Sequence, residues 1–178
     1  MRAGRTSLGV CVILMAAIAA SASAQAPSTA TTPHVLILSN QARRFLALLF
    51  ESSRVEFMGC MIGEVDGGVV RVERIAPADV APSQATETWI VPTQSCEQAG
   101  WAGTVGHIHS HPSAAQCWYY FPNTQVATSD AQTFLRTPYP VDAILCGAQV
   151  VWVSRDMMQQ QMPLRNDRDW NLLAATAR

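Results

Sequence analysis

The sequence predicts a single α/β domain, in which a mixed β-sheet is flanked by helices. Short apolar segments with the two-residue period of strands alternate with segments of helical period, in the order strand, helix, strands, helix, strands. The chain has 178 residues, of which the first 24 resemble a leader, and the remaining 154 suffice for one domain with a substantial core.

Residues 1–24 have the layout of a secretory signal peptide. Two arginines precede an apolar run at residues 8–20, and Ala-Ser-Ala at 22–24 follows it. We expect cleavage after Ala24, with Ala26 as the nearby alternative. The apolar run is too short to span a bilayer as a helix. The sequence therefore predicts an exported protein, periplasmic or secreted, with no membrane span in the mature chain.

The first half of the domain begins with a strand and a helix. HVLIL at 34–38 has strand character, and Ser39 or Asn40 can cap the helix that follows. A tight Asp-Gly-Gly turn then joins two expected strands at 55–65 and 69–77. The apolar residues of the helix recur at helical spacing: Ala42, Phe45, Leu46, Leu49 and Phe50.

The second half repeats this alternation after a polar loop. Residues 103–111 read as a strand, and residues 123–137 contain a second helix that Thr128 or Ser129 begins. Two adjacent strands within residues 141–156 complete the sheet.

These elements place the domain at residues 34–156. Residues 25–33 read as a flexible linker, and residues 157–178 as a polar tail with a candidate helix around Trp170. Without the leader's two arginines the chain has 10 basic and 13 acidic residues, a net charge of −3, which argues against a nucleic-acid surface. Nothing in the pattern sets the oligomeric state.

Four cysteines remain after the leader, and an even number suits disulfides in an exported protein. Four cysteines permit three pairings. Cys60 and Cys146 lie in apolar strand-like runs and could serve as small core residues, whereas Cys96 and Cys117 lie in polar loops on either side of the histidine-rich strand. We therefore predict a Cys96–Cys117 disulfide.

The segment GHIHSHP at 106–112 holds three of the four histidines in the chain, each two positions from the next. Successive side chains of a strand alternate between its faces, so His107, His109 and His111 would project on one side. Such convergence is typical of a metal site when other elements supply the remaining ligands.

A catalytic zinc ion usually takes three protein ligands and keeps a position for water, and a hydrolase also needs a base for the water's proton. Asp130, in the first turn of the second helix, is the only carboxylate between Glu97 and Asp142 and is the candidate third ligand. Glu56 begins an apolar strand, where an acidic residue is costly without a purpose. It is the candidate base.

Two motifs and one residue follow one another along the chain: EFMGCMIG beginning at Glu56, HSHP beginning at His109, and Asp130. Together they resemble the JAMM (MPN+) zinc metallopeptidases, whose pattern is E-x-x-G-x-L-x-G, H-[ST]-H-P and S-x-x-D. The resemblance covers nearly all of the chain after the leader and implies a JAMM/MPN-like fold. It implies that His109, His111 and Asp130 bind zinc, that Glu56 is the general acid/base, and that His107 lies outside the ligand set.

Two features depart from the family pattern. Asp130 follows His111 by 19 residues, against about eleven in the family, which indicates an enlarged loop between them. Ala127 stands where the family has the serine that stabilises the oxyanion. Loss of one such donor typically costs roughly 100- to 1,000-fold in turnover. The candidates to replace it or to support the ligands are Ser110, Thr128, Ser129, His107 and the loop tyrosines Tyr119 and Tyr120.

The sequence thus predicts an exported zinc metallopeptidase that hydrolyses a peptide or isopeptide bond in a peptide or protein substrate, with a zinc-activated water and Glu56 as the base. Two alternatives remain at this point. Ala127 favours a catalytically silent MPN-like domain used for zinc binding or protein association, and the histidines alone are compatible with a metal-binding protein without catalysis.

Overall fold

The computed structural model describes residues 31–113 and 116–164. The helices of this part of the chain are α1 and α2 and one short 3-10 helix, and the strands are β1 to β7. In chain order they are β1 (Val35–Leu38), α1 (Asn40–Ser52), β2 (Met58–Asp66), β3 (Val69–Pro77), the 3-10 helix Pro82–Gln84, β4 (Thr104–Ser110), α2 (Ser129–Leu135), β5 (Val141–Cys146), β6 (Gln149–Ser154) and β7 (Gln160–Pro163).

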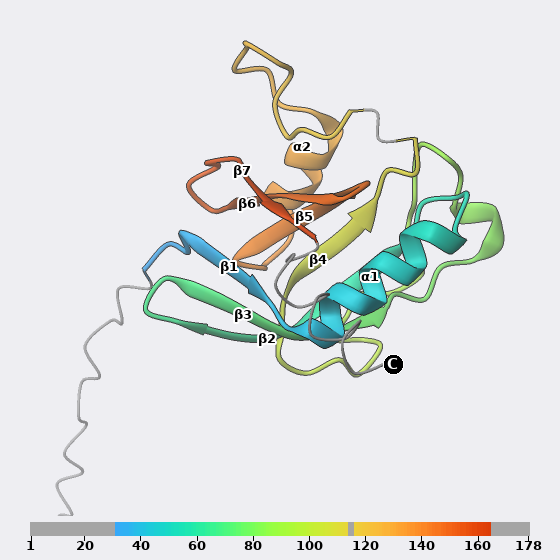
Figure 1. The fold of residues 1–178 in the computed structure, drawn as a ribbon, viewed down its shortest axis with the longest axis horizontal. Coiled ribbons are helices and arrows are strands. Elements are labelled where there is room, and N and C mark those ends of the chain that lie inside the picture. Colours follow the sequence, from blue (N-terminus) through green and yellow to red (C-terminus); the bar gives the residue numbers. More distant parts are fainter. Residues whose placement is uncertain (1–30, 114–115, 165–178) are drawn as a thin grey trace, which may run out of the picture. The chain divides into compact units, whose positions relative to one another are not determined.

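The seven strands form one curled, mixed sheet in the order β1-β3-β2-β4-β5-β6-β7 (Figure 1). β1 lies parallel to β3 and β4 lies parallel to β5, whereas the other neighbouring pairs are antiparallel. β4, which carries His107 and His109, lies centrally between β2 and β5. The described residues belong to one compact unit, so the predicted single α/β domain is confirmed at the level of fold class.

Helix α1 covers one face of this sheet and forms the main core with it. Ser39 caps the helix, since its hydroxyl accepts a hydrogen bond from the backbone N–H of Ala42 at 3.1 Å. The buried face of the helix carries Ala42 and Leu46, which join a cluster that includes Ile108 of β4. This apolar layer holds β4 in place from one side and leaves the other side of the strand for polar groups.

The β2–β3 hairpin shows why the motif EFMGCMIG has a glycine at its last position, Gly63. The pairing of β2 with β3 shifts register between Ile62 and Gly63. A Cβ atom on Gly63 would lie 1.8 Å from the carbonyl oxygen of Arg71, so only glycine allows the two strands this close approach.

The disulfides differ from the predicted one. Cys60 pairs with Cys96, and Cys117 pairs with Cys146, with Cα–Cα distances of 6.0 Å in each bridge. The Cys96–Cys117 prediction is wrong because it treated the strand cysteines as core residues. Both strand cysteines instead face loops that pack across the sheet, and each bridge ties one such loop to a strand.

The segment assigned to a polar tail also contains structure. Gln160–Pro163 form β7, which pairs antiparallel with β6 and extends the sheet by one edge strand. Its two glutamines and its short length concealed it, because a short edge strand buries little and carries a weak apolar pattern. The candidate helix around Trp170 and the leader at 1–24 lie outside the described residues. Within the described ranges, no helix has the length and apolar character needed to cross a membrane.

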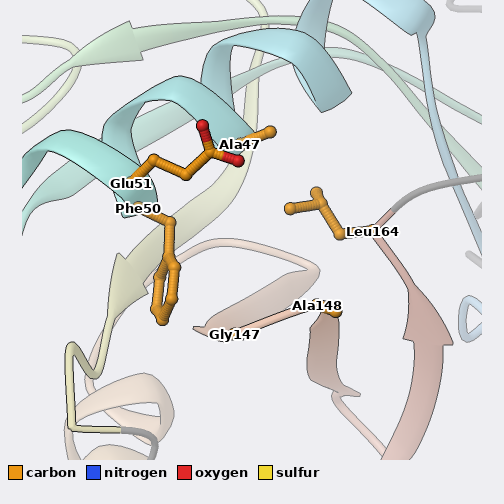
Figure 2. Close-up of a pocket in the computed structure, with 6 residues that line it drawn as sticks. All are labelled: Ala47, Phe50, Glu51, Gly147, Ala148 and Leu164. Atoms are coloured by element: carbon orange, nitrogen blue, oxygen red, sulfur yellow. The ribbon is translucent and has the colours of Figure 1, made fainter.

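An apolar pocket of about 290 Å³ opens on the side of α1 (Figure 2). It lies between the end of α1 and the β5–β6 turn, and its lining includes Phe50, Ala148 and Leu164. Ala47 of α1 belongs both to this lining and to the core under the helix. The pocket is therefore on the opposite face of the sheet from the side chain of His109.

Candidate metal centre

Strand β4 sets the direction of the histidine side chains. Ile108 is buried in the core beneath α1, so by strand alternation His107 and His109 project from the other face. His111 lies just beyond the strand, but its backbone N–H still donates to the carbonyl of Leu145 at 3.0 Å. This bond continues the pairing with β5 and keeps His111 in line with His109.

Helix α2 brings the carboxylate to these histidines. Residues 119–128 of the enlarged loop form a short hairpin, since the backbone N–H of Thr128 donates to the carbonyl of Tyr119 at 2.9 Å. Thr128 then caps α2, and Asp130 occupies its first turn. Asp130 Oδ2 lies 3.8 Å from His109 Nε2 and 3.6 Å from His111 Nε2. Asp130 therefore lies beside the histidines despite the longer separation in sequence.

His109, His111 and Asp130 form a group that could hold a metal ion, because their ligand atoms all lie within 4.8 Å of one another. His109 Nε2 is buried and has no hydrogen-bond partner among the residues that the structure describes. A buried, unsatisfied ring nitrogen carries a desolvation cost that coordination to a cation would remove. The residues present thus fit a metal ion.

The second ring nitrogen of His111 fixes which atom can bind a metal. His111 Nδ1 lies 3.1 Å from the carbonyl oxygen of Gln116, to which a protonated Nδ1 donates. That tautomer leaves the lone pair on Nε2, the atom that faces Asp130. Metal-binding histidines are commonly oriented in this way by an acceptor on the far nitrogen.

The electrostatics of the group favour a positive charge at its centre. Burial opposes protonation of His109, but Asp130, Asp142 and Glu56 outweigh it and raise the pKa of His109. Burial likewise opposes ionisation of Asp130, but His109 and His111 outweigh it and lower the pKa of that carboxyl group. Carboxylates thus surround two imidazoles in a site that suits a cation.

Glu56 lies beside this group and is buried, with 4% of its surface exposed. Its Oε1 is 3.7 Å from His111 Nε2. Burial raises the pKa of Glu56 to about 7, against a lowering contribution from His109. A carboxyl group with a pKa near neutrality can both accept and return a proton at neutral pH.

The chain holds Glu56 in place through its neighbours. The hydroxyl of Ser110 accepts from the backbone N–H of Phe57 at 3.0 Å, and the backbone N–H of Ser110 donates to the carbonyl of Phe57 at 3.0 Å. The N–H of Glu56 itself donates to the carbonyl of Thr86 at 2.7 Å. Ser110, predicted as an oxyanion or supporting residue, therefore acts on the backbone that positions Glu56.

The other candidate hydroxyl donors have different positions. The hydroxyl of Thr128 donates to the carbonyl of Tyr119 at 3.0 Å and accepts from the N–H of Ala131 at 3.4 Å, so it serves the helix cap. Ala127 forms a backbone bridge with Tyr120 and packs against an apolar cluster under α2. Ser129 is exposed at the start of α2, and its hydrogen bond to Asp130 contributes to the low pKa of that residue.

A buried polar pair beside the site was missed by the sequence reasoning. The hydroxyl of Tyr119 donates to Asp142 Oδ2 at 2.8 Å, and both residues are buried. Burial raises the pKa of Asp142 to about 6. The available signal was an aspartate in the apolar strand VDAILC, which is the same kind of observation that selected Glu56.

His107 does not join the metal group, although it shares a face of β4 with His109. Its ring packs edge-on against Tyr139, with 4.4 Å between centroids, and the Tyr139 hydroxyl donates to Glu97 Oε2 at 2.7 Å. Burial lowers the pKa of His107 to about 4, so the ring is neutral at neutral pH. Within the described residues, His107 belongs to no group that could hold a metal.

Comparison with known proteins adds no functional information. No protein-family model matches the chain, and no curated protein matches it significantly. Among solved structures, the solution structure of protein DSY2949 from Desulfitobacterium hafniense is similar, with 18% identity and a TM-score of 0.43. The match covers 72% of this chain and 90% of that chain. A likeness at this TM-score carries no argument about the function of the present chain.

Proposed function

We propose that this protein is an exported zinc metallopeptidase of the JAMM type, which hydrolyses a peptide or isopeptide bond in a peptide or protein substrate. One observation carries the proposal. The ligand atoms of His109, His111 and Asp130 lie within 4.8 Å of one another, and the carboxylate of Glu56 lies 3.7 Å from His111. Two motifs that are far apart in the sequence thus meet beside the first turn of α2.

The donor set supports zinc as the metal. Two imidazole nitrogens and one carboxylate oxygen are a common protein ligand set of catalytic zinc, which keeps a fourth position for water. When bound, zinc lowers the pKa of that water and polarises the carbonyl of the scissile bond. In the chain itself, Gln116 holds the far nitrogen of His111, and α2 holds Asp130.

Glu56 is the proposed general acid/base. It accepts the proton of the attacking water at its carboxylate and gives it to the leaving amine. Burial, against a lowering contribution from His109, raises the pKa of Glu56 to about 7, and a nearby cation would lower this pKa toward the ionised form that accepts the proton. The hydrogen bond from the Phe57 backbone to Ser110 positions the chain next to Glu56, whose Oε1 lies 3.7 Å from His111 Nε2.

Export to an oxidising compartment is part of the proposal. The structure contains two disulfides, Cys60–Cys96 and Cys117–Cys146. Disulfides persist in periplasmic and extracellular proteins and are rare where thiols are kept reduced. This is compatible with the leader that the sequence predicts at residues 1–24.

A second candidate function is a catalytically silent MPN-like domain that binds zinc or a partner protein. The observation that favours it is the lack of an evident oxyanion donor at the family position. Ala127 has no hydroxyl, and the hydroxyls of Thr128 and Ser110 are engaged by backbone groups. An active enzyme would need Ser129, a backbone N–H or the substrate's own groups to stabilise the oxyanion.

Hydrolysis of a library of peptide and isopeptide substrates separates the two functions. We expect the zinc-loaded wild-type protein to cleave at least one substrate class. Glu56→Gln should retain zinc and lose about 10²- to 10⁴-fold in rate, because the amide cannot accept the proton. Glu64→Gln, which changes an exposed carboxylate on β2, is the matched control and should keep wild-type activity. An inert wild type with bound zinc would instead support the silent domain.

A further inference from the structure

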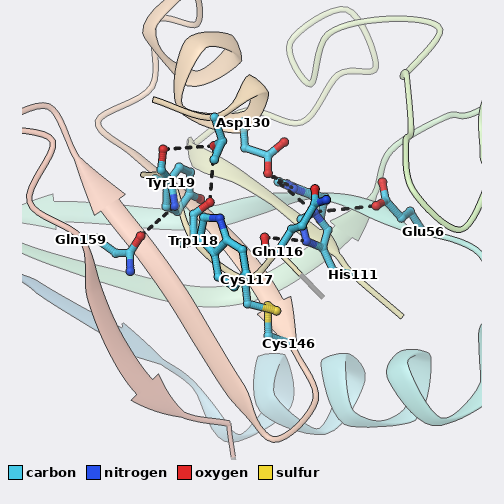
Figure 3. Close-up of a disulfide and its surroundings, with 11 residues drawn as sticks. Glu56, His111, Gln116, Cys117, Trp118, Tyr119, Asp130, Cys146 and Gln159 are labelled. Carbon is cyan, nitrogen blue, oxygen red and sulfur yellow. Dashed lines mark hydrogen bonds and ion pairs between the residues drawn. A yellow bond between two sulfur atoms is a disulfide. The ribbon is translucent and has the colours of Figure 1, made fainter. Parts of the chain in front are cut away.

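The Cys117–Cys146 disulfide lies directly against a proposed metal ligand (Figure 3). A nitrogen of His111 and the sulfurs of both cysteines all lie within 4.8 Å of one another. Cys117 is in the loop that follows the histidine motif, and Cys146 is the last residue of β5. Two potential donor sets therefore share His111: one with Asp130 and His109, and one with these two sulfurs.

The two disulfides differ in their exposure to solvent. Cys60 and Cys96 are 1% and 3% exposed, and they lie within a buried cluster. Cys117 and Cys146 are only partly buried. A reductant in solution can therefore reach the bridge beside His111, whereas the other bridge is enclosed by the fold.

We propose that reduction of the Cys117–Cys146 disulfide creates a second metal site, formed by Cys117, Cys146 and His111, which takes the metal away from Asp130. A neutral imidazole has a single lone pair, so His111 can serve only one of the two sets at a time. This inference rests on the metal-binding part of the proposed function, and it is independent of whether the centre hydrolyses peptides.

The chemistry of the step is a thiol–disulfide exchange. A dithiol reductant gives two electrons and two protons to the S–S bond, and is itself oxidised to a disulfide, while Cys117 and Cys146 become thiols. Metal binding then releases one proton from each thiol to solvent, since the thiolate is the ligand. Zinc and cobalt bind two thiolates and an imidazole readily, as in structural Cys/His sites.

The disulfide also anchors the loop that orients His111, so its reduction favours the second metal site in another way. The carbonyl of Gln116, which orients His111, precedes Cys117 directly, so the disulfide holds this carbonyl against the histidine. Reduction removes that tether at the moment when it supplies the two thiols. The oxidised chain thus keeps His111 directed at Asp130, and the reduced chain releases it.

Cobalt(II) absorption tests the proposal, because thiolate ligands give an intense near-ultraviolet charge-transfer band that nitrogen and oxygen ligands do not. The oxidised wild-type protein loaded with cobalt(II) should show only weak visible bands. After reduction with a phosphine, whose oxidation product does not bind the metal, the thiolate band should appear. Iodoacetamide should then label two cysteines in the metal-free reduced chain, and alkylation should prevent the band.

Two variants assign the ligands. Asp130→Ala should bind little cobalt when oxidised and should bind it with the thiolate band when reduced, because the second set does not use Asp130. Cys117→Ser/Cys146→Ser should bind cobalt without the band under both conditions. Circular dichroism checks that each variant folds, and the alkylated wild-type protein replaces the double variant if it does not fold.

Three results would overturn the proposal: no thiolate band in the reduced wild type, a band that persists in the double variant, or labelling of Cys60 and Cys96 in preference to Cys117 and Cys146. Failure of the proposed peptidase function is separate, since it would appear as absent hydrolysis with these spectra unchanged. Failure of the Asp130 centre would appear as oxidised wild-type protein without cobalt.

Discussion

Two histidines on one face of β4 have different surroundings, and the comparison shows what makes a metal centre. The convergent end comprises His109, with His111, Asp130 and Glu56 around it. At the other end His107 packs against the ring of Tyr139. Strand alternation places both histidines on the same face, so alternation alone does not decide which of them can bind a metal.

The difference lies in what other elements deliver to each end. Helix α2 brings a carboxylate to His109, and the carboxylates together raise the pKa of that histidine despite its burial. Tyr139 brings an aromatic ring to His107, where burial dominates and lowers the pKa to about 4. A chelating pattern in a strand therefore becomes a site only where a second element supplies the opposite charge.

Metal removal should have the largest effect, and this effect should differ between the His109 end and the His107 end of β4. We expect a chelator to lower the free energy of unfolding by about 2.7 to 4.1 kcal/mol relative to protein kept at 100 to 1,000 times the dissociation constant of zinc, because only the folded chain holds the site. Denaturant unfolding with and without chelator measures this difference. Hydrogen exchange should increase around His109 and Asp130 and stay unchanged around Tyr139; uniform loosening of both ends would argue against a local metal site.

Removing one tyrosine hydroxyl near each end should lower the free energy of unfolding by a smaller amount than metal removal, and by different amounts at the two ends. Tyr119→Phe leaves the buried carboxyl group of Asp142 without its partner and should lower the free energy of unfolding by roughly 1.5 to 3 kcal/mol. Tyr139→Phe removes a hydrogen bond to the exposed Glu97, which water can replace, and should cost less than about 1 kcal/mol. Equal losses in the free energy of unfolding, measured with urea, would contradict the view that the buried carboxyl group of Asp142 depends on the Tyr119 hydroxyl.

Ala127→Ser should have the smallest effect. Ala127 bridges to Tyr120 and packs on the cluster beneath α2, so we do not expect its side chain to reach the oxyanion. Turnover should change by less than about tenfold, which is 1.4 kcal/mol of barrier. A gain of about 100- to 1,000-fold in kcat would instead place residue 127 at the oxyanion, as in the family pattern.

Much of the fold was predictable because its elements have strong local signals. The periodicity of α1 and the Asp-Gly-Gly turn of the β2–β3 hairpin each specify structure within a few residues. The convergence of His109 and Asp130 was also predictable, since the capping residue Thr128 fixes where α2 begins and thus where Asp130 lies. Asp130 was the candidate ligand because it is the only carboxylate between Glu97 and Asp142, and the resemblance to a known family supported that choice.

The remainder depends on contacts between distant segments. The disulfide pairing was not predictable because it is set by which loop packs over which strand, and Cys96 lies over Cys60 rather than beside Cys117. The role of His107 depends on Tyr139, 32 positions further along the chain, which carries no local sign of contact with it. Strand β7 was not predicted because it has only four residues, begins with two glutamines and lies at the edge of the sheet.

The metal content of two histidine variants tests the central claim most directly. Elemental analysis of the purified protein should find one zinc ion per chain in the wild type and in His107→Ala, because His107 packs against Tyr139 and does not point its nitrogen into the donor group. His109→Ala should lose the zinc, because its buried Nε2 is one of three converging donors. Equal zinc content in the two variants, whether retained or lost, would contradict the assignment of the metal centre to His109, His111 and Asp130.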